Sequence, residues 1–249
     1  MRTIFVLLIC LTAASVQAAI PTFGTGTTNT STSEDTARTA KPPSVSSGNL
    51  VILLVVGDED NPGSGQWTTP TDFLKIFEGA SNGSDIDVAA FYKVAGASEP
   101  DSYFVENTGG ASDWVIWALL LSGQHATPLE ATGTPVIQNV GTTLTLASTS
   151  TTHDSCLAFA VYGFDGADGT PSTEVGTSWT QRSELVAGSL GNGVTAAYST
   201  RSLPSLGSSG SSRAAWNTSD GSAGCQFVIR GTVVGPADAR NRHQVWIIQ

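Results

Sequence analysis

The sequence predicts an all-β fold, an antiparallel β-sandwich of jelly-roll-like kind with an internal pseudo-repeat. Two apolar runs, at residues 50–56 and 156–162, are rich in β-branched and aromatic residues, and a glycine follows each. An acidic loop comes next in both places, and turn signals recur every 8–12 residues or so with almost no helical periodicity. The order of elements around the first run returns about 110 residues later, which indicates an internal repeat.

The first half of the predicted sandwich covers about residues 48–123. Its central run is apolar throughout, as expected of a buried strand. Asn82 and Gly83 form a strong hairpin signal between two later strands. The expected strands are, in order, residues 50–56, 73–77, 86–94, 103–105 and 114–121.

The second half covers about residues 134–231 and repeats this order. Trp179 takes the place of Trp67, a turn at residues 191–193 takes the place of the first hairpin turn, and residues 194–201 match residues 88–95. Residues 134–148 alternate as strands do, which favours one integrated sandwich, in which the two halves interleave their strands, over two halves that fold alone. The other expected strands are residues 156–162, 214–216 and 225–230.

The composition limits the classes of partner. Only 13% of the 249 residues are charged, so Ser, Thr, Asn and Gly must make up most of the polar surface, a composition associated with proteins outside the cytoplasm. The net charge is −10 with 11 basic residues, and the only basic cluster is in the C-terminal tail. Nucleic acid is therefore not an expected partner, because phosphate binding needs clustered Lys and Arg.

Residues 1–19 have the pattern of a secretory signal peptide. Arg2 precedes an apolar run at residues 4–11, and small residues lie near Ala19. The alternative is a buried N-terminal strand or helix in a protein that is never exported. Export would place the protein outside the cell, on a virion surface or as a secreted protein. Residues 20–47 are rich in Thr and Ser and are expected to form a linker or an irregular first strand.

Two cysteines remain after the leader, Cys156 and Cys225, and each opens an expected strand of the second half. Facing each other on adjacent strands, they could form a disulfide that closes a loop of about 70 residues and adds about 4 kcal/mol. The alternative is a pair of buried thiols.

The two acidic loops are the best candidates for metal binding. Carboxylate and amide oxygens beside glycines suit calcium, which takes six to eight oxygen ligands. The EF-hand pattern fails, because Thr69 stands where a glutamate is required, and a solvated polar loop is the alternative. No other cofactor is expected. The candidate ligands are Asp58, Asp60, Asn61, Asp165 and Asp168.

Other candidate side chains are better explained by packing or by turns. Trp67 and Trp179 could stack on sugars, but their matched positions in the two halves favour packing, and the same holds for Tyr92 and Tyr198. A glycosidase needs two carboxyl groups across the scissile bond. The pairs Asp85/Asp87 and Glu99/Asp101 could supply them, although exposed acids beside turns are ordinary.

The C-terminal tail, residues 232–249, differs from the rest of the chain. Basic residues precede a short apolar end, which would be unusual if exposed on a soluble monomer. It is expected either to return to the sandwich as an edge strand or to dock on a neighbouring copy by strand addition. The candidate assembly residues are Val245, Trp246, Ile247 and Ile248.

One set of motifs is similar to a known class of module. Four motifs carry the resemblance: Gly48-Asn49-Leu50-Val51, Trp67 with Pro70, the string from Phe91 to Ala95 with Ser98-Glu99-Pro100, and Trp114 before an apolar strand. Through them the chain resembles β-sandwich modules of phage virion proteins (tail, fibre and head-decoration proteins) and of secreted bacterial surface proteins. The resemblance covers about residues 42–231. The second half departs from it, with Thr200-Arg201-Ser202 where Lys-Val-Ala is expected. The resemblance implies a structural or recognition role and supplies no catalytic residues.

These observations lead to three expected functions. The first is a non-catalytic phage virion component, a decoration or appendage subunit whose partners are copies of itself or other virion subunits. The second is a secreted bacterial adhesin or carbohydrate-binding protein, which the leader favours and whose partners would be host or environmental glycans. The third, a secreted polysaccharide hydrolase, rests on the acidic residues alone.

Overall fold

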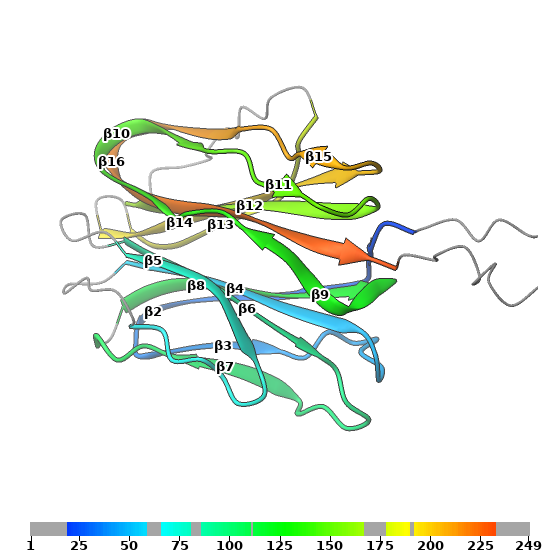
Figure 1. Cartoon of the computed structure of the whole chain (residues 1–249). Helices are drawn as coiled ribbons and strands as arrows, with labels where there is room; N and C mark the ends of the chain where they lie inside the picture. Colours follow the sequence, from blue (N-terminus) through cyan, green and yellow to red (C-terminus); the bar gives the residue numbers. More distant parts are fainter. Residues whose placement is uncertain are drawn as a thin grey trace, which may run out of the picture.

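The computed structural model describes residues 19–58, 66–80, 86–110, 112–166, 178–189 and 192–232. Every regular element in these ranges is a β-strand, and the strands form two packed antiparallel sheets of six (Figure 1). The predicted fold class, an all-β antiparallel sandwich, is confirmed. The jelly-roll likeness stays a prediction.

The first sheet has the strand order β1-β8-β4-β6-β5, with β2 also paired to β8. A separate two-stranded sheet, β3 and β7, lies below it in Figure 1. The Thr- and Ser-rich N-terminal segment therefore forms strands and not a linker. The strands are β1 (Thr22–Phe23), β2 (Thr27–Glu34), β3 (Thr36–Ala40), β4 (Leu50–Asp58), β5 (Leu74–Ala80), β6 (Ile86–Val94), β7 (Ser102–Glu106) and β8 (Ser112–Ser122).

The second sheet has the order β10-β16-β12-β14-β13, with β9 also paired to β16 and a small β11-β15 pair beside it. Among the described residues no strand is exchanged between the two large sheets, so each half of the chain supplies one sheet of a single sandwich. The expected interleaving of strands from the two halves is therefore wrong, because each central strand pairs with neighbours from its own half. The strands are β9 (Gln124–Thr132), β10 (Val136–Leu146), β11 (Ser150–Thr151), β12 (Cys156–Asp165), β13 (Thr180–Ser189), β14 (Asn192–Leu203), β15 (Gly207–Ser208) and β16 (Ser212–Gly231).

The two central strands are apolar throughout because both of their faces are covered. Alternate residues of β4 point to opposite sides of the sheet. Leu50, Ile52 and other even-numbered residues enter the core between the sheets, whereas Val51 and Leu53 enter an outer core beneath the β3-β7 pair. In the second half β12 does the same, and long β10 and β16 bend over its outer face. The result is three apolar layers, which makes the central sheets rigid.

Strand pairing aligns the two halves residue by residue. The order β8-β4-β6-β5 corresponds to β16-β12-β14-β13, and the outer strand of each pair carries a bulge at the same place, between Lys75 and Phe77 in β5 and between Gln181 and Ser183 in β13. The packing between the sheets corresponds as well, because β4 packs on β14 as β12 packs on β6. The halves therefore face each other across an approximate two-fold axis. That they arose by duplication stays a prediction.

This register corrects two details of the sequence alignment. Trp179 precedes Thr180, which pairs with Thr200, just as Phe73 precedes Leu74, which pairs with Tyr92; the counterpart of Trp179 is therefore Phe73 and not Trp67. In the same way residues 194–201 correspond to residues 86–93 and not to 88–95. The two tryptophans misled the alignment because both pack in outer cores and both precede corresponding strands, but Trp67 lies seven residues before the start of β5 and Trp179 one residue before the start of β13.

Candidate recognition site

The predicted calcium ligands are only partly described. Asp58 and Asp165 end the corresponding strands β4 and β12, while Asp60, Asn61 and Asp168 lie outside the described residues. The Asp58 carboxylate accepts a hydrogen bond from the Gly193 amide at 2.9 Å. Within the described ranges no three His, Cys, Asp or Glu side chains lie close enough to hold a metal. Asp58 thus has a structural contact, and calcium binding stays a prediction.

Cys156 and Cys225 lie on the adjacent strands β12 and β16 but cannot bond. Cys156 pairs with Arg230 and Cys225 with Val161, so the thiols are five positions apart along the strands, about 17 Å. They also face opposite sides of the sheet. Both are free, and burial raises the pKa of Cys156 to about 11 and that of Cys225 to about 12. The disulfide prediction is wrong, and the alternative of buried thiols is correct.

The leader and the assembly residues Val245, Trp246, Ile247 and Ile248 lie outside the described part of the chain. The places where the two terminal segments join the fold are described. The Ala19 amide donates to the Thr232 carbonyl at 3.2 Å, and the Thr232 amide donates to the Gly123 carbonyl at 2.9 Å. Both segments therefore join the sandwich at the same end, on the right in Figure 1.

The packing role expected of the tryptophans is confirmed, since Trp67 and Trp179 are buried in the two outer cores. Tyr198 is also buried and packs edge-on against Trp117, with ring centroids 5.5 Å apart. Tyr92 is only partly buried.

The candidate carboxylate pairs do not form two available acids. Asp85 lies outside the described residues, and Asp87 is fully buried. Asp101 is exposed, but the Glu99 side chain is only 4% exposed and lies 3.1 Å from the Lys93 ammonium group.

Glu99 is the centre of a buried polar cluster that holds the loop after β6. It accepts hydrogen bonds from the Gly96 amide at 2.8 Å and from the Tyr103 hydroxyl at 3.1 Å. Burial alone would raise the pKa of Glu99, but these hydrogen bonds and Lys93 outweigh burial and lower it. Lys93 also lies 5.4 Å from the centre of the Phe73 ring. The Tyr-Lys-Val-Ala…Glu-Pro string therefore encodes a cluster that orients Lys93.

Two neighbouring cavities share Lys93 and Asp72, one on each face of the first sheet, and we call them together the Asp72 groove, with an outer and an inner lobe. Both residues line both lobes. The outer lobe has a cavity of about 300 Å³ and is completed by Pro70, Thr71, Phe73, Pro100, Ser102, Tyr103 and Phe104. The inner lobe has a cavity of about 280 Å³ and is completed by Leu74, Tyr92, Val94, Ala126, Thr127, Pro128 and Leu129.

The groove collects exposed apolar side chains. Of the seven large apolar residues that are exposed in the described chain, three line it: Leu74 at 59%, Val94 at 46% and Phe104 at 49% exposure. The Arg38 guanidinium lies 5.2 Å from the centre of the Phe104 ring. Exposed apolar residues that cluster in a concave surface are typical of a binding site.

The second half of the molecule shows that the fold does not require these residues. By strand register, Leu74 corresponds to Thr180, Tyr92 to Thr200 and Val94 to Ser202. Thr180 and Ser202 are exposed as well, so the same backbone positions are built with polar side chains in one half and apolar ones in the other. The apolar groove is therefore specific to the first half. Sequence reasoning missed it because the two halves were aligned out of register.

The turn that precedes β5 places Asp72 in an unusual backbone conformation. The Phe73 amide donates to the Pro70 carbonyl at 3.0 Å, closing a turn in which Asp72 has φ of 66°. Aspartate adopts this left-handed region more readily than most residues. The Asp72 side chain is exposed and has no hydrogen-bond or ion-pair partner in the described chain.

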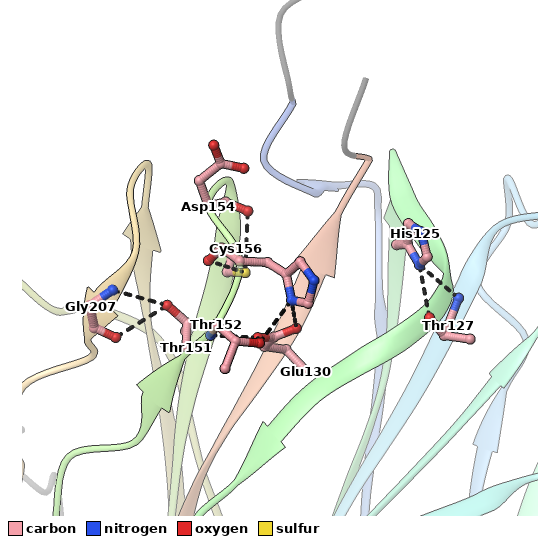
Figure 2. A network of polar contacts seen from close by, with 9 residues as sticks. His125, Thr127, Glu130, Thr151, Thr152, Asp154, Cys156 and Gly207 are labelled. Atoms are coloured by element: carbon pink, nitrogen blue, oxygen red, sulfur yellow. Dashed lines mark hydrogen bonds and ion pairs between the residues drawn. The ribbon is translucent and has the colours of Figure 1, made fainter. Parts of the chain in front are cut away.

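A polar network anchors the opposite wall of the inner lobe, formed by β9 (Figure 2). Glu130 follows the lobe residue Leu129 in the chain, and its side chain is only 4% exposed. Its carboxylate accepts hydrogen bonds from the Thr152 amide and hydroxyl, both at 2.7 Å, and its other oxygen lies 2.7 Å from His153 Nδ1. Burial would raise the pKa of Glu130, but these contacts outweigh it and lower the pKa. At the other end of the wall, the Thr127 amide donates to His125 Nδ1 at 3.1 Å.

The groove can therefore hold an amphipathic ligand between two fixed walls. Its apolar surfaces suit carbon–hydrogen faces, Asp72 offers two acceptor oxygens, and Lys93 has three donors of which one is directed at Glu99.

Comparison of the whole chain with protein-family models, with curated proteins and with solved structures found no match in any of the three. Among the residues that the structure describes, there is no helix with the length and hydropathy needed to cross a membrane.

Proposed function

We propose that this protein is a non-catalytic structural and recognition protein that works outside the cytoplasm, in its leading version as a decoration or appendage subunit of a phage virion. The observation that carries the proposal is the Asp72 groove, an apolar concave surface in one half that the other half builds with polar residues. A site that the fold does not need is best explained by binding.

The scaffold suits such a role. Three apolar layers hold the groove walls, and the clusters around Glu99 and Glu130 fix the loops at its edges. The surface relies on Ser, Thr, Asn and Gly, and the net charge of −10 opposes non-specific association. The resemblance of the first half to virion modules favours the phage version.

In this proposal the apolar residues Val245, Trp246, Ile247 and Ile248 attach the subunit to its neighbours by strand addition. Deletion of residues 245–249 tests that step. We expect the truncated protein to remain folded but to lose association, measured by light scattering after size exclusion or by incorporation into particles. Unchanged association or incorporation would contradict the assembly role.

The second candidate is a secreted bacterial adhesin or carbohydrate-binding protein, which the signal-like pattern of residues 1–19 favours. The intact mass of the protein from its natural source separates the two candidates. A chain that starts near Ala19 favours secretion, and one that starts at Met1 favours the virion subunit.

A further inference from the structure

We infer that the Asp72 groove binds a short neutral glycan, a chain of pyranose rings that runs from the outer lobe past Asp72 and Lys93 into the inner lobe. The inference rests on the recognition part of the proposed function and names the ligand class of that site. The argument combines the apolar walls, the polar groups between them and the charge of the chain.

The outer lobe offers a ring surface of the kind on which sugars pack. Phe104 is half exposed on β7 and directly opposite Arg38 of β3, whose guanidinium lies against the ring. On the buried side of β7, Tyr103 and Phe73 form an edge-on pair with centroids 5.5 Å apart, which packs the strand that carries Phe104. An aromatic side chain supplies large contact area at a small cost in conformational entropy, and the carbon–hydrogen face of a pyranose covers it well.

The polar groups of the groove match vicinal hydroxyls. The Asp72 carboxylate has no protein partner in the described chain, and its two oxygens can accept from two neighbouring hydroxyl groups. Hydrogen bonds to an ionised acceptor are about twice as strong as neutral ones. Lys93 and Ser102 line the groove and can donate to further sugar oxygens, whereas the Thr127 hydroxyl is held by His125 Nδ1 at 2.8 Å.

The charge pattern selects a neutral glycan over other occupants. The net charge of −10 repels acidic polysaccharides, and the Asp72 carboxylate itself faces the ligand. A purely apolar segment would bury the Asp72 carboxylate without a hydrogen-bond donor, which is costly. The C-terminal tail also carries Arg240 and Arg242, which can pair with a carboxylate, so its occupation of the groove is one of the outcomes of the test. A glycan satisfies both the carboxylate and the apolar walls.

The size of the groove indicates an oligosaccharide. Each lobe is near the lower end of the range of about 300–1,000 Å³ that is usual for ligand pockets. The lobes lie on opposite faces of the first sheet, on either side of Asp72 and Lys93, so a ligand of several rings that occupies both must pass around the Asp72 turn at the start of the edge strand β5.

The test is isothermal titration calorimetry of the full-length protein with maltotetraose, cellotetraose and chitotetraose, and with an oligogalacturonate as the acidic comparison. We expect saturable binding of at least one neutral tetrasaccharide and weaker or no binding of the acidic one. Absence of binding to all neutral tetrasaccharides at millimolar concentration would overturn the inference, and so would preferential binding of the oligogalacturonate.

Three variants place the site. The double variant Leu74→Thr, Val94→Ser introduces the residues that the second half carries at the same positions, so the fold should tolerate it. Asp72→Asn keeps the shape and the tolerance of positive φ but removes the charge, and Phe104→Ala removes the platform. Each should weaken binding by about tenfold or more. The control Val140→Ala alters another exposed apolar residue, at 70% exposure, and should not change affinity.

The remaining outcomes are also decisive. Wild-type affinity in all three variants would place any bound sugar elsewhere and overturn the inference. Binding that appears only after deletion of residues 233–249 would show that the tail fills the groove and would overturn it for the intact chain. Light scattering on the same samples reports assembly separately: loss of sugar binding with assembly intact rejects the glycan alone, whereas loss of assembly with sugar binding intact rejects only the assembly role.

Discussion

At the scale of single residues, close approach of the two sheets depends on Gly163. It lies on the inner face of β12, and a Cβ atom there would be 2.5 Å from Val56 Cγ1 and 2.7 Å from Val88 Cγ2. Val56 is the residue of β4 that corresponds to Gly163 by register, so a glycine in one half accepts a valine of the other. At the approximate two-fold axis the two halves therefore contribute side chains of different volume, a glycine from one and a valine from the other.

Gly163→Ala should destabilise the protein by about 2 kcal/mol, because the added methyl group overpacks the core. Urea unfolding followed by tryptophan fluorescence measures the effect. Gly96→Ala is the matched control, since a Cβ there would meet only Glu99 Oε1, at 3.8 Å, and should cost much less. Equal stability of Gly163→Ala and the wild type would show that the sheets separate without cost at this point.

Glu130 gives a prediction about the stability of the fold at low pH. Its pKa is lower in the folded chain than in the unfolded one, so its contribution to stability is complete above the unfolded value, about 4.3, and is lost as the pH falls through the folded value. Glu130→Gln should cost about 2 kcal/mol at pH 7, with the difference from wild type shrinking below about pH 4.

Glu184→Gln is the control, because the pKa of Glu184 is shifted in the opposite direction to that of Glu130. Burial raises the pKa of Glu184, an effect that a hydrogen bond from Gln181 reduces without cancelling. Its ionised form is therefore disfavoured in the folded state, and replacement by glutamine should cause no loss of stability at pH 7. If the free energy of unfolding of the two variants depends on pH in the same way, Glu130 does not anchor β9 as proposed.

At the scale of strands, Asp58 joins the end of β4 to the β13-β14 hairpin of the other sheet through the Gly193 amide. Asp58→Ala removes the acceptor and should cost about 1 kcal/mol, whereas Asp58→Asn keeps an acceptor oxygen and should stay near wild type. Melting temperatures in EDTA and in calcium chloride decide the role. The structural contact predicts the same ranking in both, and a calcium site predicts that only calcium stabilises the wild type and that Asp58→Asn loses this gain.

The strands themselves were largely predictable, for a physical reason. Continuous apolar runs such as residues 50–56 have one good solution, a strand covered on both faces. Strands β5 and β6 pair as a hairpin, as expected, while the predicted turn at Asn82-Gly83 lies outside the described residues. The register between the halves was not predictable, because it is set by pairing with the central strands β4 and β12, and the two tryptophans that suggested an alignment stand at different distances before β5 and β13. The residues of β16 between 216 and 225 were missed as strand because they are small and polar, yet pairing with β10 continues there.

The candidate site was harder to predict than the fold. The Glu99 cluster lies in the string that the sequence analysis singled out, but its partners Lys93 and Tyr103 meet only through the loop after β6. Asp72 lies in the turn before β5 of the first sheet and Leu129 on β9 of the second, so they come together only when the sheets pack. For the cysteines, strand adjacency was correct, but the face of each thiol depends on a one-residue parity that spacing does not reveal.

At the scale of the whole molecule, the two halves share a scaffold and differ in surface. Equivalent strands pack across an approximate two-fold axis, so corresponding positions have the same strand partners in the two halves. Each half thus serves as an internal reference for the other. On this comparison the first half carries the recognition groove, and the second half supplies the sheet that completes the inner lobe through β9.

The measurement that tests this account most directly is an amide NMR titration of the full-length protein with the tetrasaccharide that binds best. The account predicts that the shifted amides cluster at residues 71–74, 92–94, 102–104 and 126–129, around Asp72. Shifts that cluster instead at the corresponding positions of the second half, residues 178–182 and 200–202, or that are spread evenly over the sandwich, would contradict it.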